Sequence, residues 1–348
     1  MGMIRLPRPQ PRELKPAVLA IDGGNSKTDV ALVAADGTLL ASARGPGVPG
    51  MLAPEETIRV LGSLARAAAA QAGLPAAGPG PRIARHLSAC VANADLPEEE
   101  RQLDEALRAQ GWSDTTRLAN DTFAVLRAGL DGPGPHWGVA VTCGAGTNCV
   151  GVAPDGRTAR YLALGELTGD WGGGHGLGRE AVWWAIRAED GRGPHTALRE
   201  AVAAHFGEAS MYDVAVGFHT GKLGGEALYG LVPVLFEVAR GGDQVALDLV
   251  GRQAGEVCVM AVAAMRRLGL GDEPVPVVLG GGVLTARDPL LTAEITRRFA
   301  DEAPLATLRI VDIPPVGGAA LLGLDHIGAP PGARARLRDA YLAQPAPP

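Results

Sequence analysis

The sequence predicts an α/β protein of two domains that share one plan and hold a ligand between them. Its 348 residues exceed the size at which a single hydrophobic core usually keeps growing. Two glycine turns, each between apolar strands, lie about 120 residues apart, at Gly23-Gly24 and at Gly144 to Gly146. A third apolar strand ends in Gly280 to Gly282. The repeated strand, turn and strand unit suggests that two related domains arose from one ancestral unit.

The first half is expected to begin with a flexible leader, residues 1–16, in which Pro and Arg follow no periodic pattern. An N-terminal domain is predicted over 17–133. Apolar periodicity and turn signals predict strands at 19–22, 29–35, 38–43, 83–92 and 116–120, and helices at 55–72 and 97–110. The last of these strands delivers Asp121 at its end.

The second half, 134–330, is predicted to form a C-terminal domain that repeats the opening hairpin. Its expected strands are 137–142, 149–153, 275–279 and 308–311, and its expected helices are 179–188, 194–207, 223–240 and 243–268. A glycine-dense loop, 164–178, precedes the first of these helices. The segment 333–343 is a candidate terminal helix that returns to the first domain.

Composition excludes several classes of function. Hydrophobic residues make up 47% and charged residues 20% of the chain, and the formal net charge is -6. An acidic balance argues against general nucleic-acid or membrane-surface binding. The cysteines form no Cys-x-x-Cys pair, so neither zinc nor an iron–sulfur cluster is expected. No segment resembles a signal peptide or approaches the ~20 apolar residues of a membrane span, and we therefore expect a cytoplasmic protein.

The opening hairpin has the residues of a phosphate-binding turn. Glycine frees the backbone to approach an anion, hydroxyl groups donate hydrogen bonds, and lysine adds positive charge. The candidate contacts are Gly23, Gly24, Asn25, Ser26, Lys27 and Thr28. An ordinary Gly-Gly hairpin with a polar tip is the alternative. The P-loop and dinucleotide-binding glycine patterns are both absent, which argues against those two nucleotide-binding folds.

Five sequence blocks in a fixed order carry a family resemblance. They are Asp22-Gly-Gly-Asn-Ser-Lys-Thr28, Asn120-Asp121, Gly144-Ala-Gly-Thr-Asn148, Gly169-Asp170 and Leu279-Gly-Gly-Gly282. Over roughly residues 17–325 the chain resembles the BadF/BadG/BcrA/BcrD ATPase family, to which N-acetylglucosamine kinases belong. The resemblance implies the actin/hexokinase-like (ribonuclease H-like) duplicated two-domain fold, with ATP and Mg²⁺ bound in a cleft between the domains.

The resemblance also implies roles for particular residues. Residues 23–28 match the first phosphate motif, and Asp22 matches the carboxylate that holds Mg²⁺. The second phosphate motif and the adenosine motif correspond to Gly144, Gly146, Thr147, Gly280, Gly281 and Gly282. Asp121 would be the catalytic base toward the sugar hydroxyl. Asn120, Asp121, Gly169 and Asp170 would bind the sugar.

Two of these carboxylates have structural alternatives. Asn-Asp-Thr is also good helix-capping chemistry, so Asp121 can be a cap or turn former. Asp170 can form an Asx turn within its glycine-rich loop. Trp171 either stacks on a sugar or fills a domain interface, and His175 is expected to be structural.

Three departures from the family pattern concern the acceptor side. Val48 stands where the resemblance implies an Asn, and Ala163-Leu-Gly165 replaces a Gly-Trp pair. Ala145 replaces a hydroxyl residue of the second phosphate motif. The identity of the sugar is therefore left open among N-acetylglucosamine, glucosamine, N-acetylmuramic acid and related sugars.

Three functions are compatible with these observations. The first is an ATP-dependent kinase that phosphorylates a hydroxyl, expected to be O6, of N-acetylglucosamine or a related amino sugar. The second is an ATPase activator of a radical dehydratase or reductase, which would need closely placed cysteines for an iron–sulfur cluster. The third is a sugar sensor without catalysis, for which a partner module would be expected. A homodimer is implied by the resemblance alone.

Overall fold

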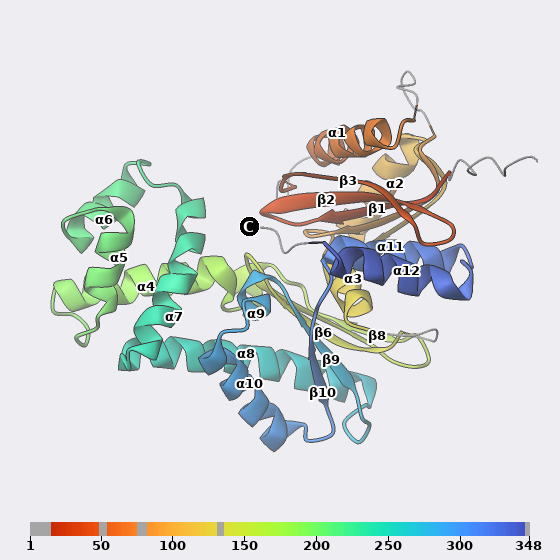
Figure 1. The fold of residues 1–348 in the computed structure, drawn as a ribbon. Helices are drawn as coiled ribbons and strands as arrows, with labels where there is room; N and C mark the ends of the chain where they lie inside the picture. Colours follow the sequence, from red (N-terminus) through yellow and green to blue (C-terminus); the bar gives the residue numbers. More distant parts are fainter. Residues whose placement is uncertain (1–14, 49–53, 75–81, 131–135, 345–348) are drawn as a thin grey trace, which may run out of the picture.

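The computed structural model describes residues 15–48, 54–74, 82–130 and 136–344. Two five-stranded sheets form its framework (Figure 1). The first contains, in spatial order, β3 (Leu39–Pro46), β2 (Lys27–Ala34), β1 (Pro16–Gly23), β4 (Ala84–Val91) and β5 (Ser113–Ala119). The second contains β8 (Thr158–Arg160), β7 (Thr147–Val152), β6 (Gly138–Cys143), β9 (Pro276–Gly280) and β10 (Thr307–Ile310).

The two sheets have the same topology. In each, a central strand, β1 or β6, pairs antiparallel with the strand that follows it along the chain. On its other side the central strand pairs parallel with β4 or β9, and an outer parallel strand, β5 or β10, completes the sheet. The predicted duplicated α/β fold is therefore confirmed.

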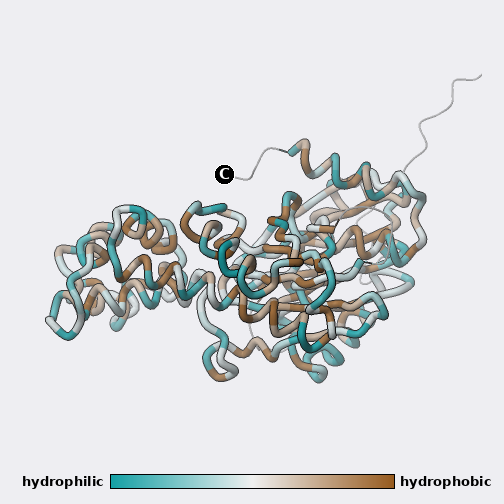
Figure 2. Tube along the Cα trace, turned by 90° about the horizontal axis from the view of Figure 1, so that it is seen from below, coloured by the Kyte–Doolittle hydropathy of each residue, from teal (hydrophilic) through white to brown (hydrophobic). Residues whose placement is uncertain are grey.

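The helices cover the sheets in layers (Figure 1). They are α1 (Pro54–Gln71), α2 (Pro97–Ala109), α3 (Asp121–Ala128), α4 (Gly173–Glu189), α5 (Leu198–Phe206), α6 (Met211–His219), α7 (Leu231–Arg240), α8 (Gln244–Leu268), α9 (Gly282–Thr285), α10 (Pro289–Glu302), α11 (Pro315–His326) and α12 (Pro331–Leu342). Helices α1 and α2 pack on the outer face of the first sheet, and α8 and α10 on that of the second. Helices α3 and α11 lie between the sheets with buried residues of both. Helices α4 to α7 project as a separate lobe in both views (Figures 1 and 2).

Helices α3 and α11 cross at very short range because the contact residues are small. A Cβ added to Gly318 would lie 1.9 Å from the carbonyl oxygen of Ala124. Gly323 is similarly close to Val18 of β1. These glycines let α11 pack against both α3 and the first sheet.

The C-terminal helix α12 contacts the turn between β2 and β3. A Cβ on Gly37, whose φ is +87°, would overlap the carbonyl of Ala333, and Arg336 forms an ion pair with Asp36. The segment predicted to return to the first half is thus a helix in contact with that half. The domain boundary near residue 133 lies outside the described residues and stays a prediction.

Several elements differ from the sequence-based predictions. Strand β1 begins at Pro16, within the expected leader, whose residues 1–14 are outside the described part. Helices α3, α6, α9, α10 and α11 and the short strand β8 were not predicted. Helix α11 was missed because its glycines have a low helix propensity. In the folded protein, the close packing that these glycines permit overrides that propensity. For the same reason α4 begins at Gly173 instead of Arg179.

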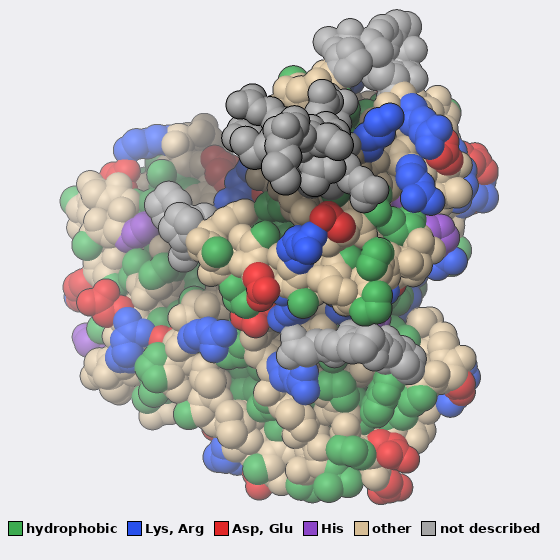
Figure 3. All heavy atoms as spheres, turned by 45° about the vertical axis from the view of Figure 1, so that its right-hand side comes forward, with side chains coloured by type: hydrophobic (Ala, Val, Ile, Leu, Met, Phe, Trp, Pro, Cys, Tyr) green, Lys and Arg blue, Asp and Glu red, His purple; other side chains and the backbone are tan. Residues whose placement is uncertain are grey.

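The surface carries both signs of charge. Figure 3 shows basic and acidic side chains interspersed on one face of the molecule. Of the helices in the described ranges, none combines the length and apolar character that a membrane crossing requires.

Candidate active site

The first glycine turn joins β1 to β2. The amide of Gly24 donates to the carbonyl of Lys27 at 2.9 Å, and Asn25, Ser26 and Lys27 are exposed at the tip. The loop after β3 packs against this turn, and the amide of Val48 donates to the carbonyl of Gly24 at 2.9 Å. The exposed tip can therefore offer backbone amides, a hydroxyl and an ammonium group to an anion.

The side chain of Thr28 is not placed for the phosphate contact that was expected of it. It pairs directly with Gly23, and a Cβ on Gly23 would point toward Val91 and Val48. Directly opposed residues of an antiparallel pair face the same side, so the Thr28 hydroxyl lies in this apolar environment. It is fully buried and has no hydrogen-bond partner among the described residues. The predicted hydroxyl contact to phosphate is therefore not available from Thr28 in this conformation.

Asp22 lies at the end of β1 with other carboxylates around it. It is buried and is directly opposite Asp29 on β2. Burial, followed by the negative charges of Asp121 and Asp29, raises the pKa of Asp22 well above its ordinary value, and Lys27 and Arg44 oppose this rise. Asp29 itself is paired with Arg44 at 2.6 Å. The carboxylate of Asp22 therefore lies close to the negative charges of Asp29 and Asp121.

This environment fits a divalent cation. Oxygen ligands suit Mg²⁺, which keeps several waters and is commonly held by one or two carboxylates together with substrate phosphates. Within the described ranges no group of three or more His, Cys, Asp or Glu side chains is arranged as a metal cage. A cation next to Asp22 would offset the repulsion among Asp22, Asp29 and Asp121.

Asp121 is the first residue of α3. Asn120 caps the helix, since its Oδ1 accepts hydrogen bonds from the amide of Thr122 at 3.1 Å and from its hydroxyl at 2.5 Å. The capping role considered for Asp121 therefore belongs to Asn120. Burial raises the pKa of Asp121 to about 6, although the amides of Thr122 and Asp121 oppose the rise. A carboxylate with such a pKa can accept a proton efficiently near neutral pH.

The second glycine turn joins β6 to β7 and is held against the start of α4. The amides of Gly174 and His175 donate to the carbonyls of Gly144 and Ala145 at 2.7 and 2.9 Å. Fully buried Gln253 accepts from the amide of Gly173 at 2.9 Å. The second turn is therefore hydrogen-bonded to the start of α4.

Space remains open on the other side of this turn. A Cβ added to either Gly144 or Gly146 would meet no atom within 4 Å. The third glycine run packs beside the turn, where a Cβ on Gly281, whose φ is +84°, would lie 2.3 Å from the carbonyl of Cys143. The structure thus brings the predicted second phosphate motif and adenosine motif together.

A pocket lies where the two halves of the molecule meet. The first half contributes Ala92, Asn93, Asp95, Asn120 and Asp121, and the second contributes Thr142, Gly144, Ala145, Gly146, Thr147, Asn148 and Ala163. The first turn adjoins this pocket through a hydrogen bond from Asn93 to Asn25 at 2.7 Å. Predicted catalytic and phosphate-binding residues from segments far apart in sequence therefore line one cavity.

Gly169 and Asp170 are not among the residues that line this pocket. Asp170 instead accepts a hydrogen bond from the hydroxyl of Thr168 at 2.6 Å, next to the short helix η1 (Gly165–Thr168). This local contact favours the turn-forming alternative in the present conformation, and sugar binding by Asp170 stays a prediction.

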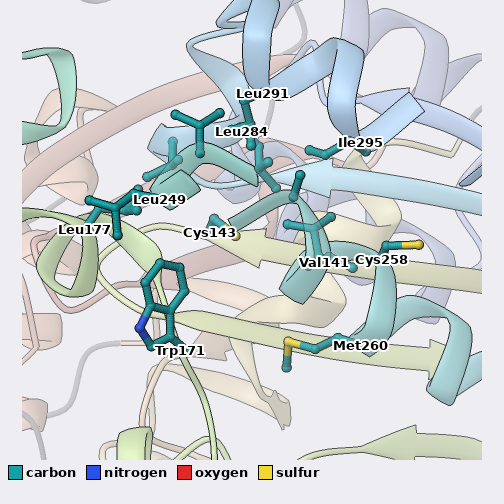
Figure 4. Packing of buried hydrophobic residues seen from close by; sticks show 14 of the residues in the cluster. Val141, Cys143, Trp171, Leu177, Leu249, Cys258, Met260, Leu284, Leu291 and Ile295 are labelled. Atoms are coloured by element: carbon teal, nitrogen blue, oxygen red, sulfur yellow. The ribbon is translucent and has the colours of Figure 1, made fainter. Parts of the chain in front are cut away.

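Trp171 belongs to the core of the second half. It is buried in the same cluster as Val141, Leu177 and Leu249 (Figure 4), and the guanidinium of Arg252 lies 4.0 Å from its ring centroid. This packing favours a structural role for Trp171 over stacking on a sugar.

Asp95 and Asn148 were absent from the predicted site residues. Both line the pocket, and Asn148 donates to Asp95 at 3.2 Å. A signal for Asp95 was present, since it comes shortly after the buried strand β4. Asn148 stands in the second phosphate motif itself.

Replacement of Gly281 by Ala is expected to destabilise the fold by about 2 kcal/mol and to weaken ATP use, because the positive φ and the nearby Cys143 carbonyl leave no place for a methyl group. Chemical unfolding and the KM for ATP measure the two effects. Gly271→Ala is the matched control, since its added Cβ would meet no atom within 4 Å. Equal stability of the two variants would contradict the expected role of Gly281.

The two related sheets, with a glycine turn in each half, are the duplicated arrangement of the actin/hexokinase-like class that the resemblance implies. The sequence profile of the BadF/BadG/BcrA/BcrD ATPase family matches residues 19–323. The chain belongs to this family, as its sequence blocks indicated.

Curated relatives and solved structures agree with this assignment. The N-acetylmuramic acid/N-acetylglucosamine kinase of Clostridium acetobutylicum is 26% identical over 77% of this chain and 85% of its own length. The N-acetyl-D-glucosamine kinase of Dictyostelium discoideum is 26% identical over 62% of this chain and 67% of its own length. A Chromobacterium violaceum structure, provisionally described as an N-acetylglucosamine kinase, superimposes with a TM-score of 0.69 at 25% identity and covers 89% of this chain and 99% of its own.

A more distant structure shows how widely the fold extends. The ROK family glucokinase of Streptomyces griseus, solved with glucose and AMPPNP, gives a TM-score of 0.55 at 17% identity, over 89% of this chain and 98% of its own. At this identity the likeness concerns the fold alone.

Proposed function

We propose that this protein is an ATP-dependent sugar kinase, which transfers the γ-phosphoryl group of ATP to a hydroxyl, expected to be O6, of N-acetylglucosamine or a related amino sugar. The observation that carries the proposal is the pocket in which the Asp121 carboxylate and the 144–147 turn face the same space. The names of the relatives from Clostridium and Dictyostelium support the class of acceptor.

In this proposal Asp121 accepts the proton of the sugar hydroxyl as its oxygen attacks the γ-phosphorus. The new oxygen–phosphorus bond forms while the bond to the β,γ-bridging oxygen breaks, and ADP leaves with that electron pair. Phosphoryl transfer depends mainly on positioning and charge stabilisation. The first and second turns would hold the phosphates through backbone amides, Ser26 and Lys27, and residues 280–282 would adjoin the adenosine.

Asp22 would hold Mg²⁺, by way of water or directly. When bound, the ion supplies positive charge that neutralises the phosphate oxygens and orients them. The crowded carboxylates around Asp22 are the observation that supports this assignment.

The choice of sugar is the open part of the proposal. Val48 is buried and packs beneath the first turn, near Gly23. Its side chain offers no hydrogen bond where the family resemblance implies an Asn. N-acetylglucosamine and N-acetylmuramic acid, which the names of the relatives mention, are the first acceptors to test.

The activator alternative is not favoured by the cysteines. Cys90, Cys143, Cys149 and Cys258 are all buried, and burial raises the pKa of the Cys143 and Cys258 thiols to about 12. A cluster held between subunits needs accessible thiolates. A cytoplasmic location, expected from the sequence, and a homodimer, expected from the family, accompany the proposal.

A coupled assay of ADP release with a panel of sugars tests the function. The panel contains N-acetylglucosamine, N-acetylmuramic acid, glucosamine and glucose, and product analysis identifies the phosphorylated hydroxyl. ADP release that no sugar stimulates would refute the kinase, and an iron-dependent chromophore would support the activator instead.

Activity should fall as the pH decreases through about 6. Asp121 must be ionised to accept a proton, and burial raises its pKa to about 6, so protonation below that pH removes the base. We expect kcat/KM for the sugar to decrease about tenfold for each pH unit below this point. The profile is measured at saturating Mg·ATP, and constant activity between pH 7 and 5 would contradict the role of Asp121.

A further inference from the structure

The carboxylate of Asp95 receives hydrogen bonds from both halves of the molecule. Its Oδ1 accepts from Asn120 Nδ2 at 2.8 Å and from Asn148 Nδ2 at 3.2 Å. Asn120 precedes α3 in the first half, and Asn148 lies on β7 of the second sheet. Asp95 thus joins the two sides of the pocket at one oxygen atom.

The other ends of the two amides are also occupied. Asn120 Oδ1 accepts from both the amide and the hydroxyl of Thr122, and Asn148 Oδ1 accepts from the amide of Cys149 at 2.7 Å. An amide side chain has donors on one side and an acceptor on the other. Asn148 Nδ2 also donates to Asn120 Oδ1 at 3.4 Å. A carboxylate at position 95, which only accepts when ionised, favours this direction of both amide groups.

The backbone that carries Asp95 is held from both halves as well. Glu99 accepts from the amides of Asp95 and Leu96 at 3.2 and 3.0 Å. Arg160, on β8 of the second sheet, donates to the carbonyl of Ala94 at 2.9 Å and to Glu100 at 2.6 Å. The carboxylate therefore sits on a supported loop.

We propose that Asp95 is a positioning residue for phosphoryl transfer, whose ionised carboxylate holds Asn120, and through it the start of α3 at Asp121, in register with Asn148 across the pocket. This inference rests on the proposed kinase function. Asp121 lies next to Asn120 in the chain, so a rotation of the Asn120 amide would release the cap that sets the helix start. A displacement of about 1 Å at a reacting group can cost on the order of 10²-fold in rate.

The groups around Asp95 act on its pKa in opposite directions. Burial, followed by the charges of Asp121 and Glu99, raises the pKa of Asp95 to about 7, while Arg160 and Asn148 oppose the rise. The amide and guanidinium groups thus offset only part of the rise, and the arrangement that depends on the ionised form is complete above about pH 7.

Three variants test the proposal with the sugar that the wild-type enzyme phosphorylates best. Asp95→Ala removes the acceptor and should lower kcat/KM for the sugar by about 10 to 100-fold. Asp95→Asn keeps an acceptor oxygen without the charge and should lose less than about tenfold. In both, the KM for ATP should stay within about twofold of wild type, because the second glycine turn is held by the amides of Gly174 and His175 at the start of α4 and not by Asp95. Glu105→Ala is the control, because Glu105 lies on the exposed face of α2 and pairs with Arg101, and its kcat/KM should equal that of wild type.

Three results would contradict this inference, and a fourth would refute the kinase function on which it rests. Wild-type kcat/KM in Asp95→Ala would overturn the inference and leave the kinase intact. So would equal losses in Asp95→Asn and Asp95→Ala, or a similar loss in Glu105→Ala. A wild-type protein that phosphorylates no sugar would instead refute the proposed function, and the inference with it.

Discussion

Replacement of Asp121 by Asn should lower kcat by about 10²-fold or more while the affinity for ATP changes little. Asn has nearly the same shape but cannot accept the proton of the attacking hydroxyl. The helix start should survive, because the cap is supplied by Asn120. Since burial raises the pKa of Asp121, its ionised form costs stability in the folded state above its ordinary pKa. The neutral Asn should therefore keep or raise the melting temperature at pH 7.

Steady-state kinetics, calorimetric ATP binding and thermal unfolding together check this expectation. Asp104→Asn is the matched control, because Asp104 is on α2, pairs with the exposed Arg108 and does not line the pocket. Turnover near that of wild type would exclude Asp121 as the base. Loss of ATP binding in parallel with turnover would place Asp121 on the nucleotide side of the cleft.

The duplicated fold could be predicted because its signals are local. Each hairpin is specified by apolar strands and by the glycines between them, so the repetition is visible without any tertiary information. Helix α11 could not be found in this way. Its Gly317-Gly318 pair disfavours a helix in isolation, and only the crossing with Ala124 of α3 explains why small residues are required there.

The candidate site shows the same limit. Asp121 was predicted from its place after a strand and from the family resemblance, and the structure brings it to the 144–147 turn. The roles of Asp95 and Asn148 depend on a contact between residues 53 positions apart, which no sequence period reports. Thr28 was predicted as a phosphate contact because its hydroxyl can donate a hydrogen bond. Its position in the strand instead directs the side chain into the core.

Asp22→Asn should reduce kcat/KM for Mg·ATP by roughly 10²-fold or more with every acceptor sugar, because several kcal/mol of charge stabilisation depend on the position of the ion. Asp22 lies at the end of β1, beside the proposed phosphate site. The decrease in kcat/KM should therefore be the same whichever sugar is offered. The same substitution should raise the melting temperature of the metal-free protein at pH 7. The pKa of Asp22 is raised in the folded state, so stability is greatest where the group is protonated and decreases as the pH rises through that pKa. Asn removes this cost.

Kinetics over a Mg²⁺ titration and thermal unfolding with and without Mg·ATP measure both effects. Wild type should gain stability on addition of Mg·ATP, and Asp22→Asn should lose most of that gain. Asp36→Asn is the control, because Asp36 lies in the exposed turn after β2 and is paired with Arg336. A loss confined to one sugar would contradict the metal assignment and place Asp22 on the acceptor side. A lower melting temperature of the metal-free variant would contradict the electrostatic account, in which Asp22 carries repulsion that only a cation relieves.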